Sequence, residues 1–95
     1  MQTLMQPLNP AMPQPNLSQL QLPLLLHLQS PGICRVATRT GLHVGNLKLI
    51  GSIWKFKAIG YDASGSVIPG GGPLTGRHNT VFAGLDESEI NRVLI

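Results

Sequence analysis

Hydrophobic and polar residues alternate most regularly between residues 54 and 58. Trp54, Phe56 and Ala58 occupy one set of positions, and Lys55 and Lys57 occupy the other. A repeat of two is typical of a half-buried β-strand, because successive side chains point to opposite faces of a sheet. We therefore expect a strand here, with the three hydrophobic side chains in the core and the lysines facing solvent. Exposed aromatics between lysines would instead favour base stacking.

A turn signal follows this strand at residues 62–65. Asp62 is suited to accept hydrogen bonds from the backbone that follows it, and Gly65 adopts positive φ without strain. We expect residues 66–68 to return as the second strand of a hairpin. Pro69 is expected to end it, because proline cannot donate a hydrogen bond to the ladder.

Weaker alternation predicts further short strands on both sides of this hairpin. The candidate segments are residues 33–40, 42–44, 48–50 and 81–82. Gly51 and Ser52 interrupt the pattern just before Trp54, which indicates a bulge or a tight bend.

The C-terminal residues carry the signals of a helix start. Asp86 fits the N-cap position, Glu89 follows three residues later as in a capping box, and Leu85 and Ile90 could form a hydrophobic staple. The predicted helix is too short to be stable alone in water, so we expect it to pack on the sheet. The predicted fold is therefore α+β, a small antiparallel sheet of three to five strands with one C-terminal helix.

Residues 1–32 have a different composition, dominated by Gln, Pro and Leu. Frequent prolines exclude a regular helix over the first half of this segment and favour extended chain. We expect an extended or disordered N-terminal arm, followed by a β-rich domain over residues 33–95. In the apolar run of the arm, Leu24, Leu25 and Leu26 are expected to be buried by a partner.

The same apolar run argues against a membrane span or a signal peptide. It is shorter than the ~20 apolar residues that a bilayer requires, and no basic residue precedes it. A cytoplasmic protein, or a component of an assembled particle, is therefore favoured over a protein secreted by a signal peptide.

The net charge is +3, from seven basic and four acidic residues, and its distribution is uneven. The first charged residue is Arg35, and the first acidic residue is Asp62. The middle third is therefore locally basic, which permits an acidic partner or a nucleic acid. The single cysteine, Cys34, excludes an internal disulfide.

Arg77 and His78 form the densest polar cluster. Histidine transfers protons near neutral pH, and arginine stabilises anions, so these residues with Lys55 and Lys57 could bind or cleave RNA without a metal. The alternative is a hydrogen-bonded turn or a partner contact.

The glycine-rich segment at residues 70–76 is not followed by the Lys-Ser/Thr pair of a phosphate-binding loop, which favours a flexible surface loop. Cysteine and histidine spacing predicts no metal site, and no cofactor is expected.

Two functions from different classes remain open. The first is a non-enzymatic interaction or assembly module, such as a virion or secretion-system accessory protein, that binds a protein partner or a second copy through its arm. The second is a small basic RNA-binding or RNA-cleaving domain centred on Arg77 and His78. The sequence carries no recognisable enzyme motif in support of either function, so we expect binding more than catalysis.

Overall fold

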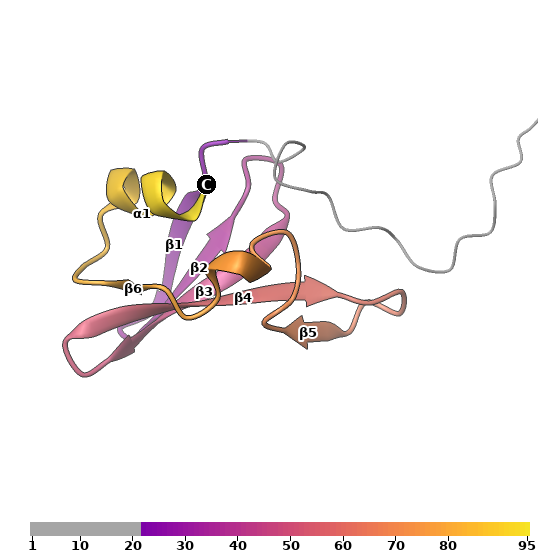
Figure 1. The fold of residues 1–95 in the computed structure, drawn as a ribbon, viewed down its shortest axis with the longest axis horizontal. Coiled ribbons are helices and arrows are strands. Elements are labelled where there is room, and N and C mark those ends of the chain that lie inside the picture. The colour runs from indigo at the N-terminus through magenta and orange to yellow at the C-terminus, as the bar shows by residue number, and fades with distance from the viewer. Residues whose placement is uncertain (1–21) are drawn as a thin grey trace, which may run out of the picture.

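The computed structural model describes residues 22–95, which form one curved antiparallel sheet and a C-terminal helix (Figure 1). The strands follow the order β1-β2-β3-β4-β5, and β6 pairs with β4. The elements are β1 (Leu25–Ser30), β2 (Ile33–Ala37), β3 (His43–Ile50), β4 (Ile53–Tyr61), β5 (Val67–Pro69), the 3-10 turn η2 (Thr75–Arg77), β6 (Val81–Phe82) and α1 (Glu87–Leu94). The predicted α+β fold is confirmed.

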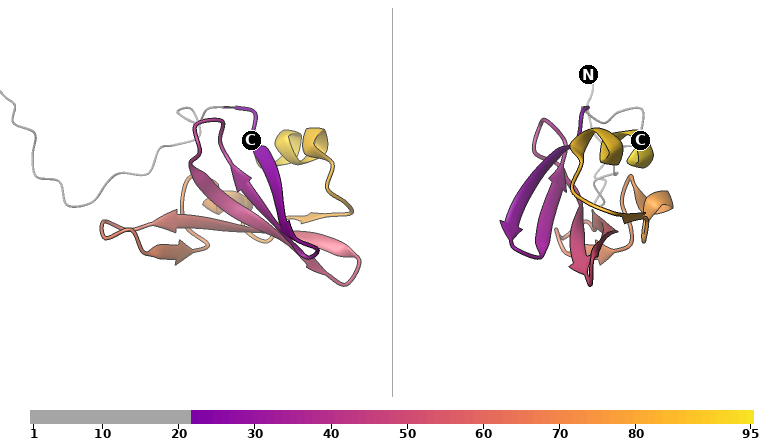
Figure 2. Two further views of the ribbon diagram at one scale, coloured as in Figure 1. Left: turned by 180° about the vertical axis from the view of Figure 1, so that it is seen from behind. Right: turned by 90° about the vertical axis from the view of Figure 1, so that its left-hand side faces the viewer.

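Strand β4 has the two faces that its alternation predicts. Phe56 and Ala58 are fully buried, and Trp54 is partly buried against the same core. On the other side of this core lie Ile90 and Leu94 of α1, both fully buried. The sheet curves around α1, as the two views of Figure 2 show. The prediction that Trp54, Phe56 and Ala58 face inward, towards the helix, is therefore confirmed.

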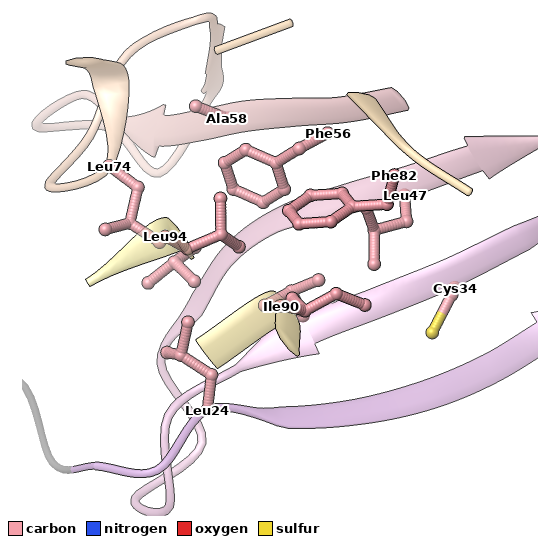
Figure 3. Close-up of a cluster of buried hydrophobic side chains, with 11 residues drawn as sticks. Leu24, Cys34, Leu47, Phe56, Ala58, Leu74, Phe82, Ile90 and Leu94 are labelled. Carbon is pink, nitrogen blue, oxygen red and sulfur yellow. The ribbon is translucent and has the colours of Figure 1, made fainter. Parts of the chain in front are cut away.

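The core brings together side chains from every layer of the fold (Figure 3). The buried cluster consists of Leu24, Cys34, Val36, Val44, Leu47, Phe56, Ala58, Leu74, Phe82, Ile90 and Leu94. The ring of Phe56 lies directly over the backbone of Gly45, where a Cβ would collide with the ring atoms Cε1 and Cζ. Glycine at residue 45 therefore allows the Phe56 ring of β4 to pack closely on β3.

Strand β1 lies within the predicted arm. It pairs with β2 from Leu25 opposite Ala37 to Leu28 opposite Cys34, and Leu24 just before it is fully buried in the core. The sheet therefore begins before residue 33, because the leucines at this point fill space beside α1. Residues 1–21 of the predicted arm, which was expected to cover residues 1–32, lie outside the described residues.

Two turns of the sheet follow their sequence signals. Gly51 and Ser52 connect Ile50 to Ile53, which face each other across β3 and β4. Gly51 has φ +64°, as a two-residue hairpin loop with glycine first requires. The predicted bulge or bend is thus the tight bend between two strands.

The hairpin between β4 and β5 closes on Asp62. One carboxylate oxygen accepts hydrogen bonds from Ser64 N–H at 2.9 Å, Ser64 Oγ at 2.8 Å and Ser66 N–H at 2.9 Å. The bond from the Ser64 hydroxyl, followed by the Ser66 amide, holds the pKa of Asp62 below its ordinary value of 3.8. Gly65 has φ +87°, so the predicted turn is confirmed.

Helix α1 begins at the predicted cap. The side chain of Asp86 accepts a hydrogen bond from Glu89 N–H at 3.1 Å. Glu89 itself turns outward to Arg92, at 2.8 Å, and does not complete the capping box in this arrangement. Over residues 22–95, no helix has the length and apolar character needed to span a bilayer.

Candidate functional site

The pairing register places two rows of side chains across the sheet face that points away from α1. Residues paired directly opposite one another share a face, so a row can be followed from strand to strand. The first row is His27, Arg35, Asn46 and Lys57, and the second is Ile33, Lys48, Lys55 and Val81. We call the positively charged residues of these rows the basic face, namely Arg35, Lys48, Lys55 and Lys57.

Within the basic face, Lys48 and Lys55 lie directly opposite each other on β3 and β4. Like charges at such paired positions destabilise a sheet, because the Cβ atoms are only about 5 Å apart. No carboxylate offsets them within the strands that form the face, since the first acidic residue of the chain is Asp62. In the part of the chain that the structure describes, the one ion pair joins Arg92 to Glu89 on α1.

The charges of the two sides of the sheet therefore differ. Asp86, Glu87 and Glu89 belong to the start of α1, on the side that the sheet curves around (Figure 2). The opposite face carries the lysines and Arg35. Such segregation of charge attracts an anionic partner to one face, with a strength that falls as salt is added.

A hollow of about 400 Å³ opens between the basic face, β5 and the segment after η2. Its polar lining comes from Asn46, Lys48, Lys57 and His78, and its remaining lining from Ala58, Ile59, Val67, Pro69 and Gly70. All of its charged lining residues are lysines. The hollow therefore combines hydrogen-bond donors on one side with an apolar wall on the other, as small-molecule sites commonly do.

His78 is held at the rim of this hollow by the backbone. Its Nδ1 accepts a hydrogen bond from Ala58 N–H at 3.0 Å. Since Nδ1 is the acceptor, the ring hydrogen lies on Nε2, which remains able to donate. Nε2 lies beside Gly70, where an added Cβ would be 3.5 Å from it. Gly70 has φ +79° and donates its own N–H to Ala58 C=O at 2.7 Å.

Lys57 is also held in place by a neighbour. Its Nζ donates to Asn79 Oδ1 at 2.7 Å. Asn79 has φ 75°, and its N–H donates to Phe56 C=O at 2.7 Å, so the loop that carries it is tied to β4. An ammonium group has three donors, and this contact uses one of them.

A third group of polar contacts fixes Asn46. His43 Nε2 lies 2.9 Å from Asn46 Oδ1, and Tyr61 Oη lies 3.3 Å from His43 Nδ1. Because the amide oxygen of Asn46 faces the imidazole ring, its NH₂ group is left to donate elsewhere. The polar lining of the hollow is thus positioned on several sides before any ligand arrives.

The structure brings together only part of the predicted site. His78 and Lys57 line the same hollow, whereas Lys55 lies in the second row, and Arg77 is exposed at the end of η2. Arg77 C=O accepts from Thr80 N–H at 3.1 Å and from its hydroxyl at 2.7 Å, so this segment is also the hydrogen-bonded turn of the alternative interpretation.

The three leucines predicted to be buried by a partner lie at the start of β1 or just before it. Leu24 is fully buried among this chain's own core residues, and Leu25 and Leu26 are half-buried on β1. The burial of Leu24 is supplied by the domain itself, which makes it a structural residue. Conversely, the site includes Arg35, Asn46 and Lys48, which the sequence analysis did not select. For the two basic residues, the sequence does hold a signal, namely the long stretch without acidic residues that ends at Asp62.

The glycine-rich loop packs against β4. A Cβ on Gly60 would lie 2.6 Å from Gly72 N, and one on Gly72 would collide with Ile59 C=O. Thr75 Oγ1 also donates to Gly70 C=O at 2.6 Å. These contacts hold the loop against the strand, and this places His78 at the rim of the hollow.

The described residues do not support a metal site or a reactive cysteine. Within residues 22–95, no group of three or more His, Cys, Asp or Glu side chains is arranged to hold a metal ion. Cys34 is buried in the core, and burial raises the pKa of its thiol, which disfavours the reactive thiolate.

Comparisons with protein-family models, with curated proteins and with solved structures find no match to this chain.

Proposed function

We propose that this domain is a non-enzymatic interaction module that binds a nucleic acid strand on its basic face. The observation that carries the proposal is the direct opposition of Lys48 and Lys55, next to Arg35 and Lys57, on a face without a carboxylate. Two like charges at directly paired positions lower the stability of the free protein. A bound polyanion offsets this cost by neutralising both lysines.

The spacing of the cations fits a phosphate backbone. Lys55 and Lys57 are two residues apart on one strand, so their Cα atoms lie about 6.6 Å apart. In a B-form duplex each strand carries one phosphate per about 3.4 Å of helix axis, so this spacing corresponds to roughly two phosphates along the axis. Phosphate contacts of this kind give binding without base reading.

Binding is better supported than RNA cleavage. Base stacking would require exposed aromatic rings, whereas Phe56 is fully buried and Trp54 packs on the core. Cleavage would be favoured by a histidine or carboxylate partner beside His78, and the residues that line the hollow include neither a second histidine nor a carboxylate.

The test is fluorescence anisotropy of a short labelled single-stranded RNA, and of a matched DNA duplex, at increasing salt. For a single strand, the slope of log K against log salt is expected to be about −0.7 for each phosphate contacted. Lys48→Gln with Lys55→Gln should weaken binding and flatten this slope. Arg92→Gln, which removes one charge from α1, is the control and should bind like the wild type.

Two results would count against the proposal. One is an absence of binding to either probe at low salt, which would return the domain to protein-partner or homo-oligomer assembly. The other is a loss of binding free energy in the Arg92→Gln control that is about half the loss in the double variant, as attraction by net charge alone would give when one charge is removed where the double variant removes two.

A further inference from the structure

We propose that the hollow beside His78 seats a terminal phosphate of the bound strand, held by Lys48, Lys57 and the Nε2–H of His78. This inference rests on the proposed function and names the part of the ligand that the hollow receives. It rests on three observations: the donors that line the hollow, its apolar wall and its place at the end of the basic face.

The polar side chains of the hollow are arranged as donors. Lys57 is oriented by Asn79, His78 is oriented by Ala58 N–H, and the amide of Asn46 is oriented by His43. Each of these contacts uses one end of the polar group and leaves N–H donors over. A phosphate offers several strong acceptor oxygens to such a set, more than a carboxylate does.

The charge of the hollow fits a phosphate at the end of a strand. Lys48 and Lys57 supply two positive charges, and no carboxylate is among the lining residues. A phosphate monoester carries about −1.5 to −2 at neutral pH, whereas a diester within a strand carries a single charge. Two ammonium groups therefore match the monoester better.

The surroundings of the hollow also favour a strand end. Beyond Lys57 on the same face of β4 come Ile59, which lines the apolar wall with Val67 and Pro69, and then the turn that carries Asp62. The basic face stops at this point, so a nucleic acid strand that continued would meet apolar side chains and then the carboxylate of Asp62. The volume of about 400 Å³ lies within the range of sites that enclose small organic molecules, which accommodates a phosphate and its sugar.

The experiment compares three labelled RNA strands of one sequence, with a 5′-phosphate, with a 3′-phosphate and with neither. Either the 5′-phosphorylated or the 3′-phosphorylated strand should bind the wild-type protein roughly tenfold more tightly than the unphosphorylated strand, as charge-assisted hydrogen bonds permit. Lys57→Gln should remove this gain. Arg77→Gln is the neighbouring control and should keep it, because Arg77 is not among the residues that line the hollow.

Two variants of His78 separate its donor from its structural role. In His78→Asn, the amide oxygen can replace Nδ1 as the acceptor for Ala58 N–H, but no group replaces the Nε2–H donor. In His78→Gln, the amide nitrogen replaces the donor instead. The phosphate gain should be lost in His78→Asn and retained at least in part in His78→Gln, with the fold of each variant checked through Trp54 fluorescence.

The failures of the two proposals can be told apart by a second measurement. A free nucleoside monophosphate is titrated into the wild-type protein while the Nε2 resonance of His78 is followed by NMR. A shift without any strand binding would support the seat and overturn the proposed function. Salt-dependent strand binding that is equal for all three ends, with no shift of the His78 resonance, would overturn the seat and leave the proposed function standing.

Discussion

The side chain of Asn91 on α1 pairs with the backbone of Leu24 in the manner of a neighbouring strand. Its Oδ1 accepts from Leu24 N–H at 2.6 Å, and its Nδ2 donates to Leu24 C=O at 3.0 Å. Beside it, Glu87 accepts from Leu26 N–H at 3.3 Å. Two helix residues thus satisfy backbone groups at the free edge of β1, and this covers part of an edge that would otherwise invite another strand.

Replacement of Asn91 should therefore release both the helix and the sheet edge. Asn91→Ala leaves the two backbone groups of Leu24 without partners, and we expect a loss of about 1–3 kcal/mol in the free energy of unfolding. Urea denaturation followed by Trp54 fluorescence measures this change.

The isosteric Asn91→Asp tests the same contact more sharply. A carboxylate keeps the acceptor for Leu24 N–H but turns a second oxygen toward Leu24 C=O, so it should also destabilise the fold. Arg92→Ala is the matched control, since its ion pair with Glu89 is exposed and should contribute less than about 1 kcal/mol. Equal effects of the Asn91 and Arg92 substitutions would mean that the pairing with Leu24 adds no stability.

The close approach of Gly45 and Phe56 leads to a second prediction. In Gly45→Ala, the new methyl group meets the Phe56 ring and also lies 2.8 Å from Lys57 C=O. Overpacking of this kind should cost about 1–3 kcal/mol. Gly84→Ala, where a Cβ meets no atom within 4 Å, should be neutral within about 0.5 kcal/mol.

A double mutant tests whether the ring is the cause. If it is, Gly45→Ala combined with Phe56→Leu should be less destabilised than the sum of the single changes, by roughly 0.5–3 kcal/mol. Strict additivity in urea denaturation would place the strain in the β4 backbone instead.

The success of the sequence interpretation at β4 and α1 has a local cause. The alternation from Trp54 to Ala58 and the cap at Asp86 are each contained in a few consecutive residues, and the structure confirms both. Period and capping are properties of the local backbone, so a single sequence displays them.

The local sequence around β1 does not show which of its side chains are buried. Leu24 to Leu28 form an almost continuous apolar run, without the alternation that marks a strand with one buried face. The burial of Leu24 depends on the position of α1, whose Asn91 lies 67 residues later in the chain, whereas Leu28 in the same run is exposed. The same holds for the site, because the opposition of Lys48 and Lys55 follows from a register that no single strand encodes.

The turn at Asp62 leads to a prediction on pH. Its pKa is lower in the folded state than its ordinary value of 3.8, mainly through the Ser64 hydroxyl and then the Ser66 amide. The ionised carboxylate therefore stabilises the fold at pH values above 3.8, and this contribution is lost as the pH falls through the lower, folded-state pKa. Asp62→Asn lacks the charge, so its stability deficit against the wild type should shrink over that acidic range. A deficit that stays constant in urea denaturations from neutral to strongly acidic pH would contradict this assignment.

The opposed lysines allow stability and binding to be changed in opposite directions. Lys48→Glu places a carboxylate opposite Lys55 on β4, and we expect it to stabilise the free domain by about 0.2–1 kcal/mol while it weakens binding to a labelled RNA strand. Lys57→Gln is the comparison, because Lys57 faces the neutral Asn46 and donates to Asn79, so its loss should weaken binding without any gain in stability. Thermal unfolding and anisotropy on the same samples provide both values. A Lys48→Glu variant that is more stable and binds equally well would show that the paired lysines serve neither the fold nor a nucleic acid, and the basic face would lose its proposed role.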